Sequence, residues 1–265
     1  MVVSPSERFN ALAIIEWGEI GSPNRQEDVF EFNVITQRSD IDWQSLEYQS
    51  PYSTGIAEGV QFYGRMEKVH KLAAGLLRQP MEPFYITGQK RVGKTSLALA
   101  SARYALSKSA ANTFRFQYIL WGEIAHADPI ISLRLLGESI EEFIISHLPA
   151  GSVPTKGNYD GSLAALVRLA KVAGKIDPSL RFAIIIDEFD EIHPDLFMQG
   201  NLAETFFANM RALSRSENVC IVLVGGENIP FIMDRQGQKL NNFSRENLSY
   251  FFATNRMGRF PARCT

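Results

Sequence analysis

Two uninterrupted apolar runs, RFAIIID (181–187) and NVCIVLVGG (218–226), constrain the fold of this chain most strongly. A strand that is apolar on both faces has to be covered on both faces, which is the situation of strands in a parallel sheet. Stretches with helical spacing separate these runs from two further strand-like runs, at 84–87 and 113–121. This alternation predicts an α/β domain in which right-handed crossovers place helices on both sides of a parallel sheet.

The stretches between the strand-like runs have the spacing or the composition of helices. Most are amphipathic, and one is rich in alanine and leucine. Gly174 is the predicted C-cap of the helix at 162–174, because glycine readily takes the left-handed conformation that ends many helices. We predict helices over 66–77, 94–109, 129–148, 162–174 and 202–216.

The first sixty residues or so do not continue this pattern. Residues 11–20 suit either a strand or a short helix, and 29–35 alternates like a strand. Turn-forming residues cluster in QSPYSTGIAEG (49–59), which we interpret as a linker. The predicted organisation is an N-terminal extension or small module at 1–58, a main domain at 59–250 and a C-terminal tail at 251–265.

Composition argues against several classes of protein. The formal charge of −2 on 265 residues gives no electrostatic basis for a dedicated nucleic-acid binder, although it leaves room for a local basic patch. Two cysteines do not make a disulfide framework, and Cys220, inside an apolar run, is expected to be a small buried hydrophobe. No apolar run approaches the roughly 18 residues typical of a membrane span, and MVVSPSERFN does not resemble a secretory signal. A cytoplasmic protein without a membrane partner is the expectation.

The stretch GQKRVGKTS (88–96) has the glycine, lysine and threonine spacing of a phosphate-binding loop. Glycines allow the positive φ angles with which backbone N–H groups converge on a phosphate, and the next helix directs its N-terminal dipole at the same anion. Lys94 would supply charge to the β- and γ-phosphates, and the Thr95 hydroxyl would bind Mg²⁺. Chance gives about 0.01 such matches in a chain of this length, which leaves little room for a plain glycine turn. The candidate nucleotide-binding residues are Gly88, Gln89, Lys90, Arg91, Val92, Gly93, Lys94, Thr95 and Ser96.

A second candidate element, AIIIDEFDEI (183–192), is an apolar strand that ends in two acids. Asp187 would lie at the carboxyl end of the sheet, where α/β proteins bind ligands, and is a candidate Mg²⁺ ligand. Glu188 is the candidate catalytic residue that polarises the attacking water, alongside Lys94. The alternative is a strand followed by an acidic helix N-cap. Asp190 and Glu191 are expected to be solvated or to help start a helix.

Two weaker candidates flank this pair. In CIVLVGGENIP (220–230), Glu227 or Asn228 is a candidate γ-phosphate sensor, and the alternative is a plain exit from a strand. In FYGRMEKV (62–69), Tyr63, Gly64 and Arg65 could contact the base or ribose of a nucleotide. On chemistry alone, a turn before an amphipathic helix is favoured there.

The order of FYGR, GQKRVGKTSLA, IIIDEFDEI and VLVGG over residues 60–250 resembles that of the STAND NTPases. These are signal-transduction ATPases related to the AAA+ and origin-recognition proteins, and the wording of the loop is similar to their archaeal and bacterial branch. The resemblance implies a P-loop NTPase sandwich with strand order 5-1-4-3-2. It places Tyr63, Gly64 and Arg65 at the adenine side, and Asp187 and Glu188 beside the phosphate loop.

The resemblance also implies a molecular switch, closed with ADP and oligomeric with ATP, and some bacterial members act in defence against phage. Two departures stand out. Many members carry arginine or serine where this chain has GGEN, and the family continues into further helical and repeat domains. We therefore expect this chain to be either a fragment of a longer protein or a naturally short form.

The functional expectation is a slow, regulated ATPase that binds ATP or ADP with Mg²⁺ and forms a homo-oligomer in its ATP state. GTP is disfavoured, because the chain has no Asn-Lys-x-Asp run. Two alternatives stay open. One is a DNA-handling ATPase such as a loader or transposition helper, and the other is a nucleotide-binding module without turnover. Glu188 argues against the latter, since a site that has lost activity often loses its acid.

Overall fold

The computed structural model describes residues 8–18, 25–35, 65–110, 113–152, 156–198, 200–235 and 240–249. The chain divides into two compact units, Met1–Ser53 and Thr54–Thr265. The domain boundary predicted at 58/59 and the tail predicted at 251–265 fall outside the described residues and stay predictions.

The N-terminal unit contains a two-stranded antiparallel sheet of β1 (Arg8–Gly18) and β2 (Arg25–Ile35). The pairing runs from Arg8 opposite Ile35 to Gly18 opposite Arg25. The ambiguous segment at 11–20 is thus a strand over its described part. Several large apolar side chains of this hairpin are between 38% and 57% exposed, namely Leu12, Ile14, Ile15, Trp17, Val29 and Phe30.

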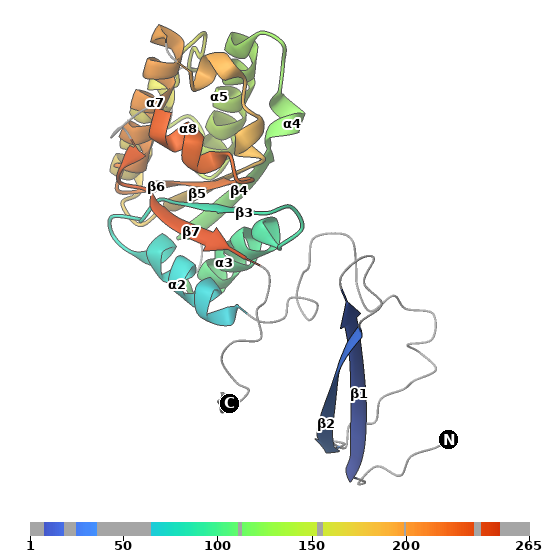
Figure 1. The fold of residues 1–265 in the computed structure, drawn as a ribbon. Coiled ribbons are helices and arrows are strands. Elements are labelled where there is room, and N and C mark those ends of the chain that lie inside the picture. Colours follow the sequence, from blue (N-terminus) through green and yellow to red (C-terminus); the bar gives the residue numbers. More distant parts are fainter. Residues whose placement is uncertain are drawn as a thin grey trace. The chain divides into compact units, whose positions relative to one another are not determined.

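The second unit is built on five parallel strands in the order β4-β5-β6-β3-β7 (Figure 1). Numbered along this domain, that is 2-3-4-1-5, so the predicted order 5-1-4-3-2 is confirmed when the sheet is read from its other edge. The last strand was not predicted from the sequence pattern. The strands are β3 (Phe84–Gly88), β4 (Phe114–Leu120), β5 (Arg181–Asp187), β6 (Val219–Val224) and β7 (Ser244–Leu248).

Helices cover both faces of this sheet, which confirms the three-layer α/β prediction. Figure 1 shows α2 and α3 on one face and α5, α7 and α8 on the other. The longer helices agree with the predicted ranges within a few residues. They are α2 (Met66–Leu77), α3 (Lys94–Lys108), α5 (Pro129–Ser146), α6 (Ala164–Ile176) and α7 (Asn201–Ser214), joined by the short α4 (Trp121–Ile124), η2 (Phe189–Glu191), η3 (Pro194–Leu196) and α8 (Ile229–Arg235).

The apolar strand β5 shows why the two-sided covering is needed. Its alternate residues Phe182, Ile184 and Ile186 pack with α5, α6 and α7, whereas Ala183 and Ile185 pack with α2 and α3. All five are at most 1% exposed. Residues of β6 divide in the same way, and Cys220 is the expected buried hydrophobe, 0% exposed.

The predicted C-cap at Gly174 is wrong. Helix α6 continues to Ile176, and the N–H of Asp177 closes it on the carbonyl of Ala173. A Cβ built at Gly174 would lie 3.4 Å from Nδ2 of Asn218, which is ordinary van der Waals contact. Gly174 is thus an interior residue of the helix that faces Asn218, and it makes no left-handed turn.

A buried carboxylate ties α2 to the edge strand β7. Glu246 accepts hydrogen bonds from Nζ of Lys68 and, at 3.0 Å, from Nζ of Lys71. Burial alone would raise the pKa of Glu246, but the two ammonium groups outweigh it and hold the pKa below its ordinary value. The link fixes β7 beside β3, the strand that leads into the phosphate loop.

None of the helices in the described ranges is long and apolar enough to cross a membrane.

Candidate functional site

The stretch 88–96 folds as a loop between the end of β3 and the start of α3. Gly88 has φ 148° and Gly93 has φ 86°, and Arg91 between them has φ 64°. Left-handed residues such as Arg91 and Gly93 turn neighbouring N–H groups toward one side, which is how a concave anion site forms. Helix α3 begins at Lys94, so its unpaired N–H groups face the same space.

Gly88 is required for a second reason, which is the proximity of β7. A Cβ on Gly88 would lie 2.1 Å from the backbone carbonyl oxygen of Leu248. No side chain fits at that separation, and the neighbouring atom is backbone that cannot turn aside. The edge strand thus packs directly against the start of the loop.

Thr95 and Asp187, the two predicted Mg²⁺ ligands, meet across the site. The Thr95 hydroxyl donates to Oδ2 of Asp187 at 2.6 Å, although the two residues are 92 positions apart in the chain. Asp187 is 5% exposed at the carboxyl end of β5. The backbone N–H of Glu188 also donates to its Oδ1, at 2.8 Å, so both carboxylate oxygens are held.

These residues fit a magnesium ion that arrives with a nucleotide. In the part of the chain that the structure describes, no group of three or more His, Cys, Asp or Glu side chains could form a metal cage by itself. Mg²⁺ does not need such a cage, because it usually keeps several waters and takes one or two protein oxygens together with substrate phosphates. Thr95 Oγ1 and Asp187 Oδ2 are oxygens of that kind.

Tyr118, on the neighbouring strand β4, is a site residue that the sequence analysis missed. Its hydroxyl donates to Oδ2 of Asp187 at 2.9 Å. Burial, and then the negative charge of Asp187, raise the pKa of Tyr118 well above 10.0, so the phenol remains a proton donor. A tyrosine in an aromatic strand gives no local signal, because the contact depends on the pairing of β4 with β5.

Lys94 lies over the loop that it is expected to serve. Its Nζ donates to the carbonyl oxygen of Gln89 at 2.7 Å. Burial lowers the pKa of Lys94, and the charges of Asp190, Asp187 and Glu227 oppose that shift. The ammonium group thus lies near several carboxylates, and its bond to Gln89 keeps it on the loop that is expected to bind the phosphates.

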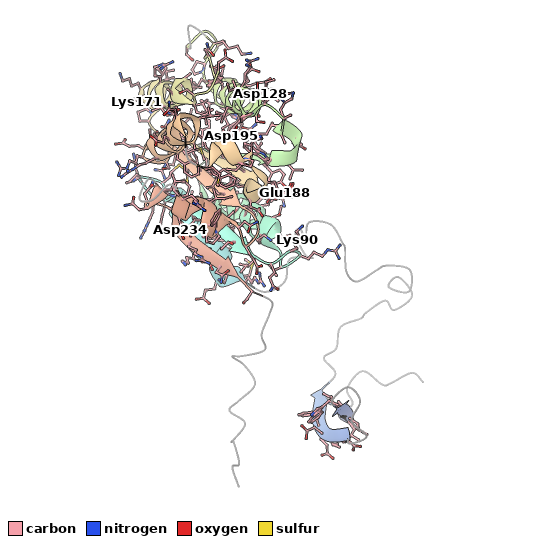
Figure 2. The ribbon with its side chains drawn as sticks, turned by 45° about the horizontal axis from the view of Figure 1, so that its top comes forward. Lys90, Asp128, Lys171, Glu188, Asp195 and Asp234 are labelled. Atoms are coloured by element: carbon pink, nitrogen blue, oxygen red, sulfur yellow. The ribbon has the colours of Figure 1, made fainter. Side chains whose placement is uncertain are left out.

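Glu188 follows β5 in a left-handed conformation, with φ 56°. Its side chain is exposed, and Gly122, at the start of the β4–α5 connection, is its neighbour, since a Cβ there would lie 3.8 Å from Glu188 Oε2. Desolvation first, and then the charges of Glu191, Asp187 and Asp190, raise the pKa of Glu188, while Lys90 lowers it. Figure 2 labels Glu188 and Lys90 on the same side of the domain.

Arg65 connects the predicted adenine-side element to the phosphate loop. It occupies the N-cap position of α2 with φ 57°. Its Nη1 donates to the carbonyl of Val92 at 2.8 Å and its Nη2 to the carbonyl of Ser249 at 2.5 Å. Tyr63 and Gly64 lie outside the described residues, so their contact with a base or ribose stays a prediction.

The exit of β6 is joined to the site through Asp190, which the sequence analysis assigned to solvent or a helix start. Asp190 is half-buried, and its Oδ1 accepts the N–H of Gly226 at 2.8 Å. A Cβ on Gly225 would lie 2.2 Å from the same oxygen, so the Gly-Gly turn makes room for this carboxylate. The Thr87 hydroxyl donates to the carbonyl of Gly226 at 2.7 Å, which links β3 to the same turn.

Of the two sensor candidates, Glu227 lies nearer the loop. It lines a cavity of about 360 Å³ together with Gly88, Gln89 and Arg245. Asn228 is exposed, immediately before α8, and none of its described contacts reaches the phosphate loop. A sensing role for Asn228 stays a prediction.

We predict that Tyr118→Phe weakens the Mg²⁺-dependent part of ATP binding by about tenfold, the lower range for residues that orient a metal ligand. The phenyl ring keeps the packing, but Asp187 loses one of its donors. Calorimetric titration of ATP with and without Mg²⁺ would measure the change. Tyr104→Phe on α3 is the matched control, because that ring packs in a tilted arrangement against His70 and not against Asp187. An unchanged Mg²⁺ dependence in Tyr118→Phe would exclude the orienting role.

No protein-family model matches this chain, and no curated protein does. Solved structures do resemble it. They include the Aeropyrum pernix ORC1 protein in complex with DNA, with TM-score 0.48 and 16% identity over 72% of this chain and 46% of that one. The Aeropyrum pernix ORC2 protein in ADPNP–ADP complexes has TM-score 0.48 and 14% identity over 75% of this chain and 50% of that one.

A third similar structure is AMPPCP-bound DnaA from Aquifex aeolicus, with TM-score 0.37 and 16% identity over 71% of this chain and 48% of that one. The chain spans about half the length of each of these three proteins. Likeness at this level concerns the fold alone. The assignment of this domain as a parallel P-loop α/β fold follows from its own strand order and loop geometry.

Proposed function

We propose that this chain binds ATP together with Mg²⁺ and hydrolyses it. The observation that carries the proposal is the 2.6 Å contact between Thr95 Oγ1 and Asp187 Oδ2, which unites the phosphate loop with the acid-bearing strand. The motifs at 88–96 and 183–192 are independent features of the sequence, and their side chains meet only if the sheet has the P-loop strand order. If the first were a plain glycine turn and the second an acidic helix N-cap, this contact would not be expected.

Each residue then has a defined role. The loop N–H groups and the N-terminus of α3 hold the β- and γ-phosphates, and Lys94 turns from the Gln89 carbonyl to the incoming phosphate oxygens. Thr95 and Asp187 hold Mg²⁺, which supplies neutralising charge when bound. Glu188 accepts a hydrogen bond from the attacking water and polarises it toward the γ-phosphorus.

We predict that Lys94→Ala reduces ATP affinity by at least about 100-fold, because the loop loses the main side-chain charge for the phosphates. Isothermal titration with Mg-ATP and Mg-ADP measures this directly. Lys108→Ala, at the other end of the same helix, is the control and should bind as the unmodified chain does. Equal affinity in Lys94→Ala and the control would remove nucleotide from this loop.

We predict that Glu188→Gln keeps ATP affinity and lowers the hydrolysis rate by about 10²–10⁴-fold, because an amide does not polarise water as a carboxylate does. Single-turnover phosphate release gives the rate, and Glu204→Gln on α7 is the control for an exposed acid. Hydrolysis at the normal rate in Glu188→Gln would assign the water-activating role elsewhere.

The raised pKa of Glu188 sets the pH dependence of that rate. The reactive form is the carboxylate, and a raised pKa means that this form is lost at a higher pH than for an ordinary glutamate of pKa 4.5. In a plot of hydrolysis rate against pH, the fall in rate on the acid side should therefore have its midpoint above pH 4.5. The residual rate of Glu188→Gln should not show this fall.

Two roles for such an ATPase remain as proposals: a STAND-type switch that becomes oligomeric with ATP, and a DNA-handling ATPase. The ORC1 structure named above contains DNA, which is a property of that protein. Duplex DNA titration at increasing salt separates the two roles. ATP-dependent binding that weakens steeply with salt supports DNA handling, which we would test first. Absence of DNA binding, with ATP-dependent mass increase in light scattering, supports the switch.

A further inference from the structure

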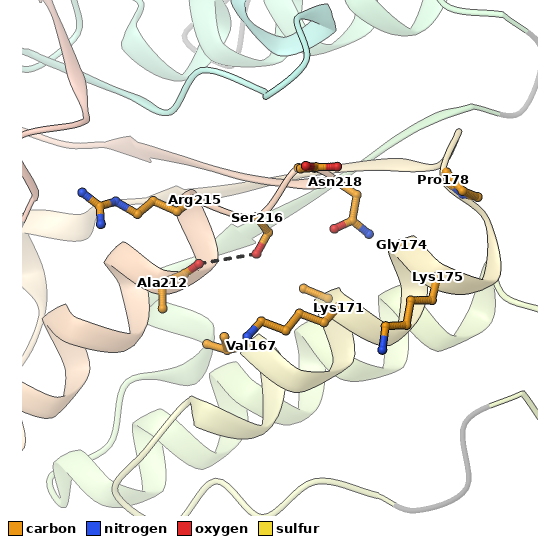
Figure 3. Close-up of a pocket in the computed structure, with 11 residues that line it drawn as sticks. Val167, Lys171, Gly174, Lys175, Pro178, Ala212, Arg215, Ser216 and Asn218 are labelled. Atoms are coloured by element: carbon orange, nitrogen blue, oxygen red, sulfur yellow. Dashed lines mark hydrogen bonds between the residues drawn. The ribbon is translucent and has the colours of Figure 1, made fainter.

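A cleft of about 520 Å³ lies between the C-terminal halves of α6 and α7 (Figure 3). Its inner end is formed by Asn218, which immediately precedes β6. Because the strands are parallel, the starts of β5 and β6 lie at the amino-terminal ends of the strands. The phosphate loop follows the end of β3 and therefore lies at the opposite, carboxyl-terminal ends. The cleft is therefore separate from the nucleotide site.

The cleft combines an apolar wall with several cations. Val167, Ala170 and Ala212 form much of the wall. Lys171, Lys175 and Arg215 also line it, whereas the acidic residue among the lining is Glu217. Figure 3 shows Lys171 extending from α6 toward the α7 side. The volume falls within the range of about 300–1,000 Å³ typical of small-molecule sites.

The three cations make no hydrogen bond or ion pair among the described residues, unlike Arg134 and Lys156 near α5, which pair with Asp160 and Glu138. Part of this charge compensates the helix ends, because Lys175 lies in the last turn of α6 and Arg215 caps α7. Lys171 lies more than a turn before the end of α6, where the helix dipole has little effect. Its ammonium group is exposed at the cleft, so it is accessible to a bound anion.

Asn218 is the second, independent observation. It is 6% exposed, yet its amide Nδ2 is buried and has no hydrogen-bond partner among the residues that the structure describes. Its backbone carbonyl accepts the N–H of Phe182 at 2.8 Å, so the residue is fixed at the inner end of the cleft. Figure 3 shows the amide directed into the space between Gly174 and Ser216. An unsatisfied buried amide lowers the stability of the fold. A bound polar group that hydrogen-bonds to the amide would remove this cost.

We propose that this cleft binds a small amphiphilic anion. The apolar body of the ligand would pack on Val167, Ala170 and Ala212. Its carboxylate, sulfonate or phosphate would face Lys171 and Lys175, and a polar atom of the body would hydrogen-bond to the Asn218 amide. This inference does not depend on the proposed ATPase activity.

The test uses the full chain and two dyes that share a ring system. 1-Anilinonaphthalene-8-sulfonate carries the anionic group, and N-phenyl-1-naphthylamine lacks it. Fluorescence titration should show saturable binding of the sulfonate and weaker binding of the neutral dye. Lys171→Gln/Lys175→Gln should weaken sulfonate binding by about tenfold or more, which is a change of about 1.4 kcal/mol. Lys108→Gln/Lys156→Gln, which alters two exposed lysines outside the cleft, should not change it.

A second variant, Asn218→Leu, separates ligand binding from structure. Leucine has nearly the same shape and removes the unsatisfied amide, so thermal stability should hold or rise while sulfonate binding weakens. Three outcomes would overturn the proposal. They are no saturable sulfonate binding, equal binding of both dyes that is unaffected by the lysine variant, and a fall in stability of Asn218→Leu with unchanged dye binding. The second outcome would place the dye on another apolar surface, and the third would make Asn218 purely structural.

Discussion

The contact between Thr95 and Asp187 is the interaction on which the functional part of this structure depends. The two residues belong to β3–α3 and β5, and β6 lies between these strands, so the contact exists only because three parallel strands end at the same edge. Apolar residues on both faces of β5 and β6 hold that arrangement. Burial of those residues between the two helical layers aligns the strands. The polar residues at the carboxyl ends of the strands are thereby brought together. The site is thus a consequence of the core, and a core change that shifts β6 would separate its two halves.

Around that contact, polar links join several of the elements that end near the site. Arg65 bonds to carbonyls of the phosphate loop and of the segment after β7, and Asp190 bonds to the turn after β6. These acceptors and donors are backbone groups, which would otherwise lose hydrogen bonds at the strand ends. If nucleotide binding shifted the phosphate loop, these bonds would transmit the displacement to the starts of α2 and α8. The chain therefore has physical connections through which a nucleotide could change its surface.

The sequence predicted the parts whose information is local. The loop spacing, the acids that end β5, and the helices and two-sided strands all follow from patterns within about twenty residues. Tyr118 was missed because its partner depends on the β4–β5 register, and Asp190 because its partner is a backbone N–H 36 positions away. Strand β7, SRENL, has little apolar alternation and becomes a strand through pairing with β3 and the bond of Glu246 to α2. Gly174 has the right residue type for a C-cap, but the helix continues past it to Ile176 and ends on the bond from Asp177 to Ala173.

Backbone strain in the described residues is concentrated at the same site. Arg65, Arg91 and Glu188 have positive φ angles although none is glycine, and such conformations cost about 1–3 kcal/mol each. Arginine and glutamate do not favour this conformation, so the cause is tertiary. The guanidinium bonds hold Arg65, the N–H bond to Asp187 holds Glu188, and Arg91 supplies the left-handed turn that a concave phosphate loop requires. The strained residues thus lie in the three elements predicted to meet the nucleotide, and functional sites are where such strain is commonly stored.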